Sequence, residues 1–391
     1  MVVNILGHHS RLPTPIHRIQ GKPRTAGKWQ PIGIIFPNDC VTIIDYLFRL
    51  AAMFDAIKST PAKICLGISA LVTLVYSLNF MLWAECYVIG GEGCFTLMSN
   101  ETVTGMISYG NGGPETAFNG ALMFGVFISI GIILNEGAKG MWKIMIPGII
   151  GFSVMTAVIW MYWGDLDSSE TPKYVVPITT LIYAAGYYFL KAEDEVDDGM
   201  SDFKMGVNIQ DKPALAALGL LAVMGAYYCL RAIAMPADTV ESFGIGTATP
   251  EMLDQGLGAP SDVTVAVGGS LFLIYWIWIM ITIMDGAKGK WAIIHPGIFF
   301  LLANLINSYV SLVDNVGAEV HRPVSDQLTM DWLTGPLALL LVLFAYYRLR
   351  DEGIEDGMPW NGEPMTPNSF NIMVISWGLG LGLMFTANIM M

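Results

Sequence analysis

The sequence predicts an all-α polytopic membrane protein with about nine transmembrane helices, arranged as two parallel four-helix repeats plus one extra helix. Three observations lead to this fold class. Hydrophobic residues make up 54% of the 391-residue chain, charged residues only 14%, and the mean hydropathy is +0.54, far from the values of soluble domains. The apolar residues fall into nine long runs, and one motif occurs twice at corresponding places between these runs.

The segment before the first apolar run is predicted to form two parts. Residues 1–38 contain several prolines and little helical periodicity, so we expect an extended arm on the cytoplasmic side. Residues 39–60 are predicted to form an amphipathic helix in the membrane interface, because the charged residues from Asp45 to Lys58 fall on one side of such a helix. A helix packed on a partner subunit would have the same pattern.

The nine apolar runs are long enough, or nearly so, to cross a hydrocarbon layer of about 30 Å. Four runs belong to a first repeat over residues 61–200, four to a second repeat over residues 201–358, and the last to residues 359–391. The fourth and eighth runs are short at corresponding places, which supports a duplication. The runs are residues 64–84, 118–135, 143–163, 174–190, 213–234, 263–284, 292–313, 333–347 and 369–390.

The repeated motif is predicted to be the hairpin between the second and third helices of each repeat. It reads NEGAKGMWKIMIPG from Asn135 and MDGAKGKWAIIHPG from Met284, with eight of fourteen positions identical. Its glycines favour a tight turn, whereas its charged residues would also suit an inner gate or a partner-docking surface. His295 replaces Ile146, and a single histidine at a helix start is more often hydrogen-bonded structure than a ligand. The candidate residues of the two hairpins are Glu136, Gly137, Lys139, Gly140, Asp285, Gly286, Lys288, Gly289 and His295.

The distribution of Lys and Arg predicts the orientation in the membrane. All of these residues lie in segments predicted to face one side, apart from Lys173, Arg231 and Arg322. Positive charge accumulates in cytoplasmic loops, so the N-terminus is predicted to be cytoplasmic, or on the equivalent side of an organelle, and the C-terminus on the opposite side. Because each repeat has an even number of helices, the two repeats are predicted to be parallel.

Two further groups of residues on the predicted outer side are candidate sites. Carboxylates are the ligands that Ca²⁺ prefers, and a short acidic segment follows the third helix of each repeat, although a solvated loop would have the same composition. Two cysteines in the first outer loop are spaced for a disulfide in an oxidising compartment. The candidate Ca²⁺ ligands are Asp165, Asp167, Glu170, Asp314 and Glu319, and the candidate disulfide joins Cys86 and Cys94.

The composition argues against several classes of function. The net charge of −13 disfavours nucleic-acid binding, and no Ser/His/Asp, Cys/His or HExxH set points to an enzyme. Within the run interiors only Arg231 is charged, near an outer end, whereas ion paths through membranes are usually marked by such charges. The many aromatic residues of the runs are expected to pack together, or to line a groove for a lipid, quinone or pigment.

Two functions are favoured, and a membrane enzyme that acts on lipid is a third candidate, for which the sequence offers no catalytic set. The chain is predicted to be a non-catalytic integral membrane subunit that scaffolds or completes a larger complex. Its predicted partners are other membrane subunits, contacted through the N-terminal arm and the helix faces, and the lipid bilayer itself, because an arm of this composition rarely orders alone. Bound lipids are expected, with Ca²⁺ or a pigment as further candidate cofactors. The alternative is a transporter or channel for a small solute, built from the two parallel repeats.

Overall fold

The computed structural model describes residues 56–82, 112–162, 171–193, 199–201, 203, 205–242, 262–317, 326–358 and 367–390. The chain divides into two units, residues 1–47 and 48–391, and every described residue belongs to the second unit. The predicted arm and most of the predicted amphipathic helix therefore lie outside the described residues. Within the described ranges the chain is helical and contains no strand.

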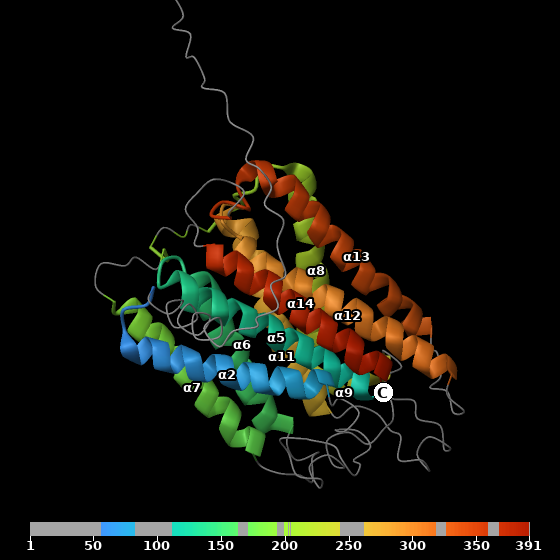
Figure 1. The fold of residues 1–391 in the computed structure, drawn as a ribbon. Coiled ribbons are helices and arrows are strands. Elements are labelled where there is room, and N and C mark those ends of the chain that lie inside the picture. The colour runs from blue at the N-terminus through green and yellow to red at the C-terminus, as the bar shows by residue number, and fades with distance from the viewer. Residues whose placement is uncertain are drawn as a thin grey trace, which may run out of the picture. The chain divides into compact units, whose positions relative to one another are not determined.

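A long helix occupies each of the nine apolar runs (Figure 1). Among the described residues, seven of these helices are long and apolar enough to cross a membrane, all except α7 and α14, and the chain is accordingly an integral membrane protein. The helices are α2 (Thr60–Leu82), α5 (Gly112–Glu136), α6 (Trp142–Tyr162), α7 (Thr171–Lys191), α8 (Lys212–Ala234), α11 (Asp262–Asp285), α12 (Trp291–Gly317), α13 (Asp326–Arg348) and α14 (Pro367–Met390), with a short α9 (Pro236–Ser242) and a 3₁₀ turn η2 (Leu349–Glu352).

The outward faces of the helices suit a lipid surrounding. Large apolar side chains on six of the described helices are more than half exposed, and such a surface is unfavourable in water but not against hydrocarbon. Representative residues are Leu71 of α2, Leu181 of α7, Val223 of α8, Leu340 of α13 and Leu379 of α14. The apolar character of α7 and α14 toward the outside thus matches that of the other helices.

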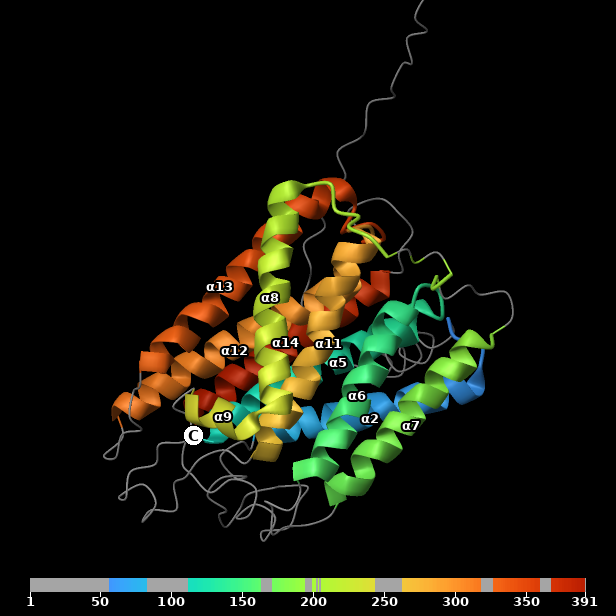
Figure 2. The same ribbon diagram turned by 180° about the vertical axis from the view of Figure 1, so that it is seen from behind.

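Helices α5 and α11 form the centre of the bundle. α5 packs against α2, α12, α14 and α11, and α11 packs against α8, α6 and α5 (Figures 1 and 2). The two central helices approach closely where Tyr275 of α11 donates a hydrogen bond to the carbonyl of Leu122 at 2.6 Å. A Cβ atom on Gly125 would lie 2.1 Å from the Tyr275 oxygen, so only glycine permits this approach.

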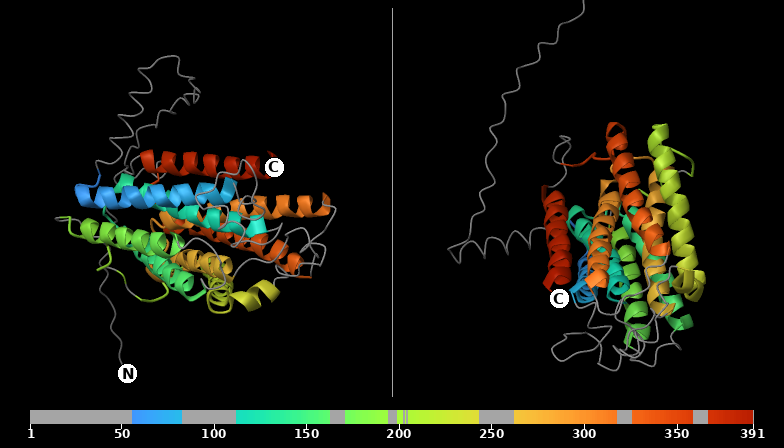
Figure 3. Two further views of the ribbon diagram at one scale, coloured as in Figure 1. Left: turned by 90° about the horizontal axis from the view of Figure 1, so that it is seen from below. Right: turned by 90° about the vertical axis from the view of Figure 1, so that its right-hand side faces the viewer.

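The sets α2–α5–α6–α7 and α8–α11–α12–α13 have corresponding neighbours. In each set the first helix packs against the second and the fourth, and the third helix packs against the fourth. Between the sets, α11 packs against α6 and, correspondingly, α5 packs against α12. Helix α14 adds to one edge, against α12, α5 and α2, and Figure 3 shows α8 at the other edge.

Candidate functional site

The two hairpins have the same backbone conformation. Gly137 and Gly140 have φ angles of 86° and 70°, and the corresponding Gly286 and Gly289 have φ angles of 83° and 67°. This left-handed region is costly for residues with a Cβ atom, which explains the glycines of the motif. We call the end of the bundle that contains both hairpins the hairpin end, and the other the opposite end.

The chain that precedes the first helix of each set crosses the corresponding hairpin glycine. A Cβ atom on Gly137 would lie 2.9 Å from the carbonyl oxygen of Ala56, and one on Gly286 would lie 3.3 Å from that of Asn208. The N–H of Asn208 also donates a hydrogen bond to the carbonyl of Ile283 at 3.0 Å, which holds the crossing chain against the end of α11. Both glycines therefore serve a close backbone crossing as well as a turn.

A carboxylate from the end of the fourth helix binds the start of the first helix in each set. Glu193 accepts hydrogen bonds from the N–H groups of Lys58 and Ser59, at 3.2 and 2.8 Å. In the second set, Glu352 accepts hydrogen bonds from the N–H groups of Gln210, at 3.1 Å, and of the residue that follows it. A negative charge at a helix N-terminus is favourable, so the same device closes both four-helix sets.

The residues at these two helix starts also correspond as N-caps. Ser59 accepts a hydrogen bond from the N–H of Ala62 at 3.3 Å, and Asp211 accepts one from the N–H of Ala214 at 2.8 Å. Arg348 at the end of α13 pairs with Asp211 at 2.5 Å. The hydrogen bond from Arg348 holds the pKa of Asp211 below its usual range. The second set is thus tied at this point by a charged pair as well as by a cap.

One carboxylate of the motif pairs both within its own hairpin and across to the other hairpin. Asp285 lies 2.6 Å from Lys290 and 3.1 Å from Lys143 at the start of α6, which joins the first set to the second. The Lys290 side chain is only 2% exposed. Burial, with a further contribution from the Lys143 charge, lowers the pKa of Lys290, and Asp285 opposes this shift.

The other charged residues of the motif have different surroundings. Lys139 is exposed. Lys288 lies 3.6 Å from Asp356, but its side chain is 75% exposed, and an ion pair at such a position contributes little to the stability of the fold. Glu136 accepts a hydrogen bond from Ser369 of α14, which in turn accepts one from Asn135 at 2.6 Å. The predicted gate residues are therefore not one cluster, since Glu136 contacts α14 whereas Asp285 joins the two sets.

His295 lies between α12, α13 and α14. Its Nε2 atom is 2.9 Å from the Tyr346 hydroxyl, and its ring centroid is 5.6 Å from that of Trp377. Its Nδ1 atom is buried and has no hydrogen-bond partner among the described residues. These contacts match a hydrogen-bonded histidine that helps to join three helices.

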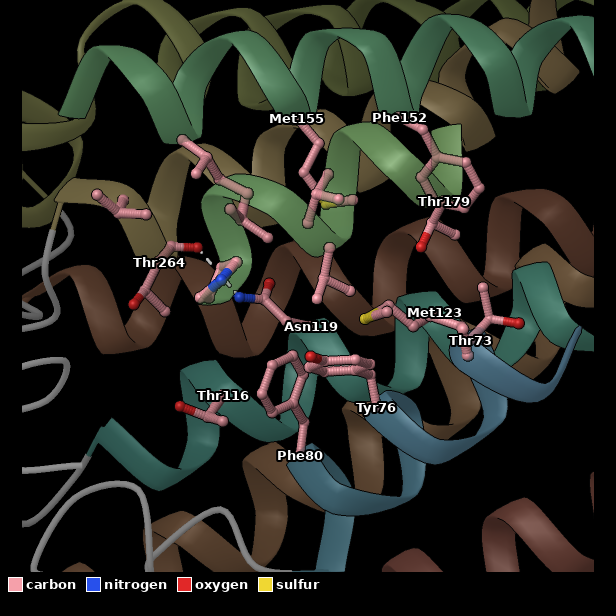
Figure 4. Close-up of a pocket in the computed structure, with 17 residues that line it drawn as sticks. Thr73, Tyr76, Phe80, Thr116, Asn119, Met123, Phe152, Met155, Thr179 and Thr264 are labelled. Atoms are coloured by element: carbon pink, nitrogen blue, oxygen red, sulfur yellow. Dashed lines mark hydrogen bonds between the residues drawn. The ribbon is translucent and has the colours of Figure 1, made fainter. Parts of the chain in front are cut away.

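A pocket lies near the opposite end of the bundle, between α2, α5, α6, α7 and α11 (Figure 4). Its cavity volume is about 90 Å³, and the empty space between the side chains is about 900 Å³ when the solvent-filled open mouth is included. None of the described residues that line it carries a formal charge. They are Val72, Thr73, Tyr76, Phe80, Thr116, Asn119, Met123, Phe152, Met155, Ile159, Pro172, Val175, Val176, Thr179, Val263, Thr264 and Val267.

A few polar atoms interrupt this apolar lining. Asn119 donates a hydrogen bond from its amide nitrogen to the carbonyl of Thr264 at 3.0 Å (Figure 4). A Cβ atom on Gly268 would lie 2.5 Å from the Asn119 amide oxygen, so this glycine makes room for the amide. The hydroxyl of Thr116 is buried and has no hydrogen-bond partner among the described residues. The pocket therefore offers apolar surface together with a small number of neutral hydrogen-bonding groups.

Several predicted site residues lie outside the part of the chain that the structure describes. Asp165, Asp167, Glu170 and Glu319, like Cys86 and Cys94, lie outside the described residues, and Asp314 lies in α12 with its side chain outside them. The Ca²⁺ and disulfide hypotheses therefore stay predictions. In the part of the chain that is described, no three His, Cys, Asp or Glu side chains group as metal ligands, and Cys65 and Cys229 are free thiols.

The most informative contacts were not predicted from the sequence. The alignment of LKAEDEVDDGM with LRDEGIEDGM pairs Glu193 with Glu352, so a signal for the two carboxylate contacts was present. Lys143 and Lys290 each occur in one copy of the motif and carry no such signal. No signal in the sequence points to the pocket either, because the pocket forms only where five helices converge. Comparison with protein-family models, with curated proteins and with solved structures finds no match for this chain.

Proposed function

We propose that the chain is a non-catalytic integral membrane subunit that scaffolds a larger membrane complex and holds a lipid or pigment between α2, α5, α6, α7 and α11. The observation that carries this proposal is the pocket, whose described lining is uncharged and mostly apolar and comes from five helices. Pockets for apolar small molecules have this composition, with a few placed polar groups that set orientation. No ion or charged substrate would find a counter-charge among these lining residues.

The proposed architecture has nine membrane spans, formed by two parallel four-helix repeats and α14. The corresponding helix neighbours, the matching φ angles of the hairpins and the paired contacts of Glu193 and Glu352 all support a duplication. The asymmetric distribution of Lys and Arg supports a cytoplasmic hairpin end and N-terminus, with the C-terminus on the other side.

The packing at the centre favours a subunit over the alternative of a transporter. Transporters built from repeats bind their substrates where the repeats meet. Here α5 meets α11, and the space between the sets is filled by Tyr275, Trp278 and Phe300, all of which are buried. The pocket instead lies mainly within the first set, to one side of this contact.

A substitution that fills the pocket tests the proposal. Met155 and Met161 both lie on α6, but Met155 lines the pocket at 6% exposure, whereas Met161 is 69% exposed. After mild solubilisation and purification, wild-type protein and Met161→Trp should retain the same apolar molecule, identified by extraction and mass spectrometry. Met155→Trp should lose that molecule while its native mass is unchanged. Equal retention by both variants would overturn the assignment of the pocket.

A further inference from the structure

We propose that the ligand of this pocket is a neutral amphiphile with a hydroxyl head, bound at Thr116 and Asn119, and an apolar chain that runs from there toward the middle of the bundle. This inference rests on the proposed function, because it names the class of molecule that the pocket would hold. Three properties of the pocket lead to it: the lack of charge, the position of the polar atoms and the hydrogen-bonding capacity that these atoms leave unused.

The described lining contains no Asp, Glu, Lys, Arg or His. A phosphate or an ionised carboxylate bound here would give up its hydration without gaining a counter-charge, which is strongly unfavourable. Phospholipid headgroups and ionised fatty acids are therefore poor occupants of the pocket. A neutral head has no such penalty, provided that its hydrogen bonds are satisfied.

Two polar side chains lie together on the same face of α5. Thr116 and Asn119 are three residues apart, so they are neighbours on the helix surface, and both line the pocket. Thr116 is only 4% exposed, and its hydroxyl has no hydrogen-bond partner among the described residues. A buried polar atom that lacks a partner is rare in folded proteins, and a bound molecule or a water in the pocket would supply the missing partner.

The hydrogen-bonding capacity of this pair fits a hydroxyl group. Asn119 uses its amide nitrogen on the carbonyl of Thr264, which leaves its oxygen as an acceptor toward the pocket. Thr116 can donate from its own hydroxyl. A ligand hydroxyl is both a donor and an acceptor, so it matches the acceptor of Asn119 and the donor of Thr116. A carbonyl would satisfy only Thr116, and a hydrocarbon would satisfy neither.

The remaining lining places the apolar chain of the ligand. From Thr116, the pocket follows α5 to Met123, which corresponds to about 10 Å at the rise of an α-helix. Its deeper part contains apolar side chains such as Phe152 and Val176. The Thr73 hydroxyl there already donates to the carbonyl of Ser69 at 2.8 Å, so it requires no partner from a ligand. A chain of roughly eight to ten carbons would span this distance.

Three probes of the same chain length test the proposal on the purified, full-length protein: 1-decanol, decane and decanoate at about pH 8, where decanoate is ionised. Their dissociation constants are measured for wild-type protein, Thr116→Val, Thr116→Ser and Thr282→Val. Thr282 is a matched control, because it is a buried threonine of α11 outside the pocket whose hydroxyl is satisfied by the carbonyl of Trp278 at 2.9 Å.

We expect 1-decanol to bind wild-type protein about tenfold more tightly than decane, and decanoate to bind more weakly than 1-decanol. Thr116→Val should raise the dissociation constant of 1-decanol about fivefold without changing that of decane. Thr116→Ser and Thr282→Val should leave both dissociation constants unchanged. If 1-decanol, decane and decanoate bind wild-type protein equally well, and Met155→Trp abolishes the binding of all three, the ligand does not need a hydroxyl head. The assignment of an apolar binding pocket is then still supported. If none of the probes binds wild-type protein, or Met155→Trp binds them as well as wild-type protein does, the proposed function itself fails.

Discussion

At the scale of single residues, the contact of Asp285 with Lys143 and Lys290 shows how a duplicated motif diverges. Lys290 takes the place that Met141 has in the first copy, so the second copy carries a buried cation where the first carries an apolar side chain. Asp285 balances this charge and at the same time reaches Lys143 of the first set. One carboxylate therefore serves both as counter-ion and as a link between the sets.

This arrangement predicts an order of stabilities. Asp285→Asn leaves two lysines without their counter-ion and should lower the free energy of unfolding by about 2–3 kcal/mol. Lys290→Met restores the residue of the first copy and leaves Asp285 paired with Lys143, so it should cost about 1 kcal/mol or less. Lys288→Met removes an exposed pair and should change stability by less than about 0.5 kcal/mol. Denaturation in detergent measures all three, and an equal loss from Lys288→Met would contradict the assignment.

At the scale of the elements, the hairpins combine two constraints that glycine alone satisfies. Their glycines have positive φ angles, and Gly137 and Gly286 also lie beneath the chain that enters the first helix of their set. Gly140 has no atom within 4 Å of a Cβ built on it. The turn conformation therefore explains all four glycines, whereas the backbone crossing explains only two.

Alanine substitutions should separate the two constraints. Gly140→Ala introduces only the strain of a positive φ and should cost about 1 kcal/mol. Gly137→Ala adds a contact of 2.9 Å with the carbonyl of Ala56 and should cost about 2–3 kcal/mol. The helical Gly219 faces open space, so Gly219→Ala should be neutral or slightly stabilising. Thermal unfolding measures the order, and an equal loss from Gly137→Ala and Gly140→Ala would show that the crossing adds nothing.

At the scale of the whole molecule, the proposed topology places the two hairpins on one side of the membrane and the ends of α8 and α9 on the other. Single cysteines on a cysteine-free background can test this. Lys139→Cys and Lys288→Cys are exposed at the hairpin end, and Met235→Cys is exposed at the opposite end. An impermeant reagent added outside should label only Met235→Cys, because the positive hairpins are expected in the cytoplasm. Labelling of either hairpin from outside would contradict this orientation.

The proposed assembly of the chain into a larger complex also belongs to this scale. Residues 1–38 contain too little apolar surface for a core of their own, so we expect them to order only on a partner. Deleting residues 2–38 should leave the helices inserted and release the chain from its complex, as measured by native gel mass. A truncated chain that still migrates with the full complex would exclude the arm as the docking element.

The sequence by itself determined the membrane class, the positions of nine helices and the hairpin glycines, because hydropathy, helix length and backbone conformation are local properties. The run predicted as residues 333–347 was too short, since α13 extends from Asp326 to Arg348. The difference concerns only the ends of this helix, because polar residues such as Asp331 continue α13 beyond the apolar run.

Only the tertiary structure decided which of these helices meet and what lies between them. Glu136 and Asp285 occupy the same place in the motif, yet one contacts α14 and the other joins the two sets. Thr116 and Asn119 line a pocket because α2, α6, α7 and α11 close around this face of α5. Such contacts depend on the packing of residues far apart in the chain, which a pattern read along the sequence does not contain.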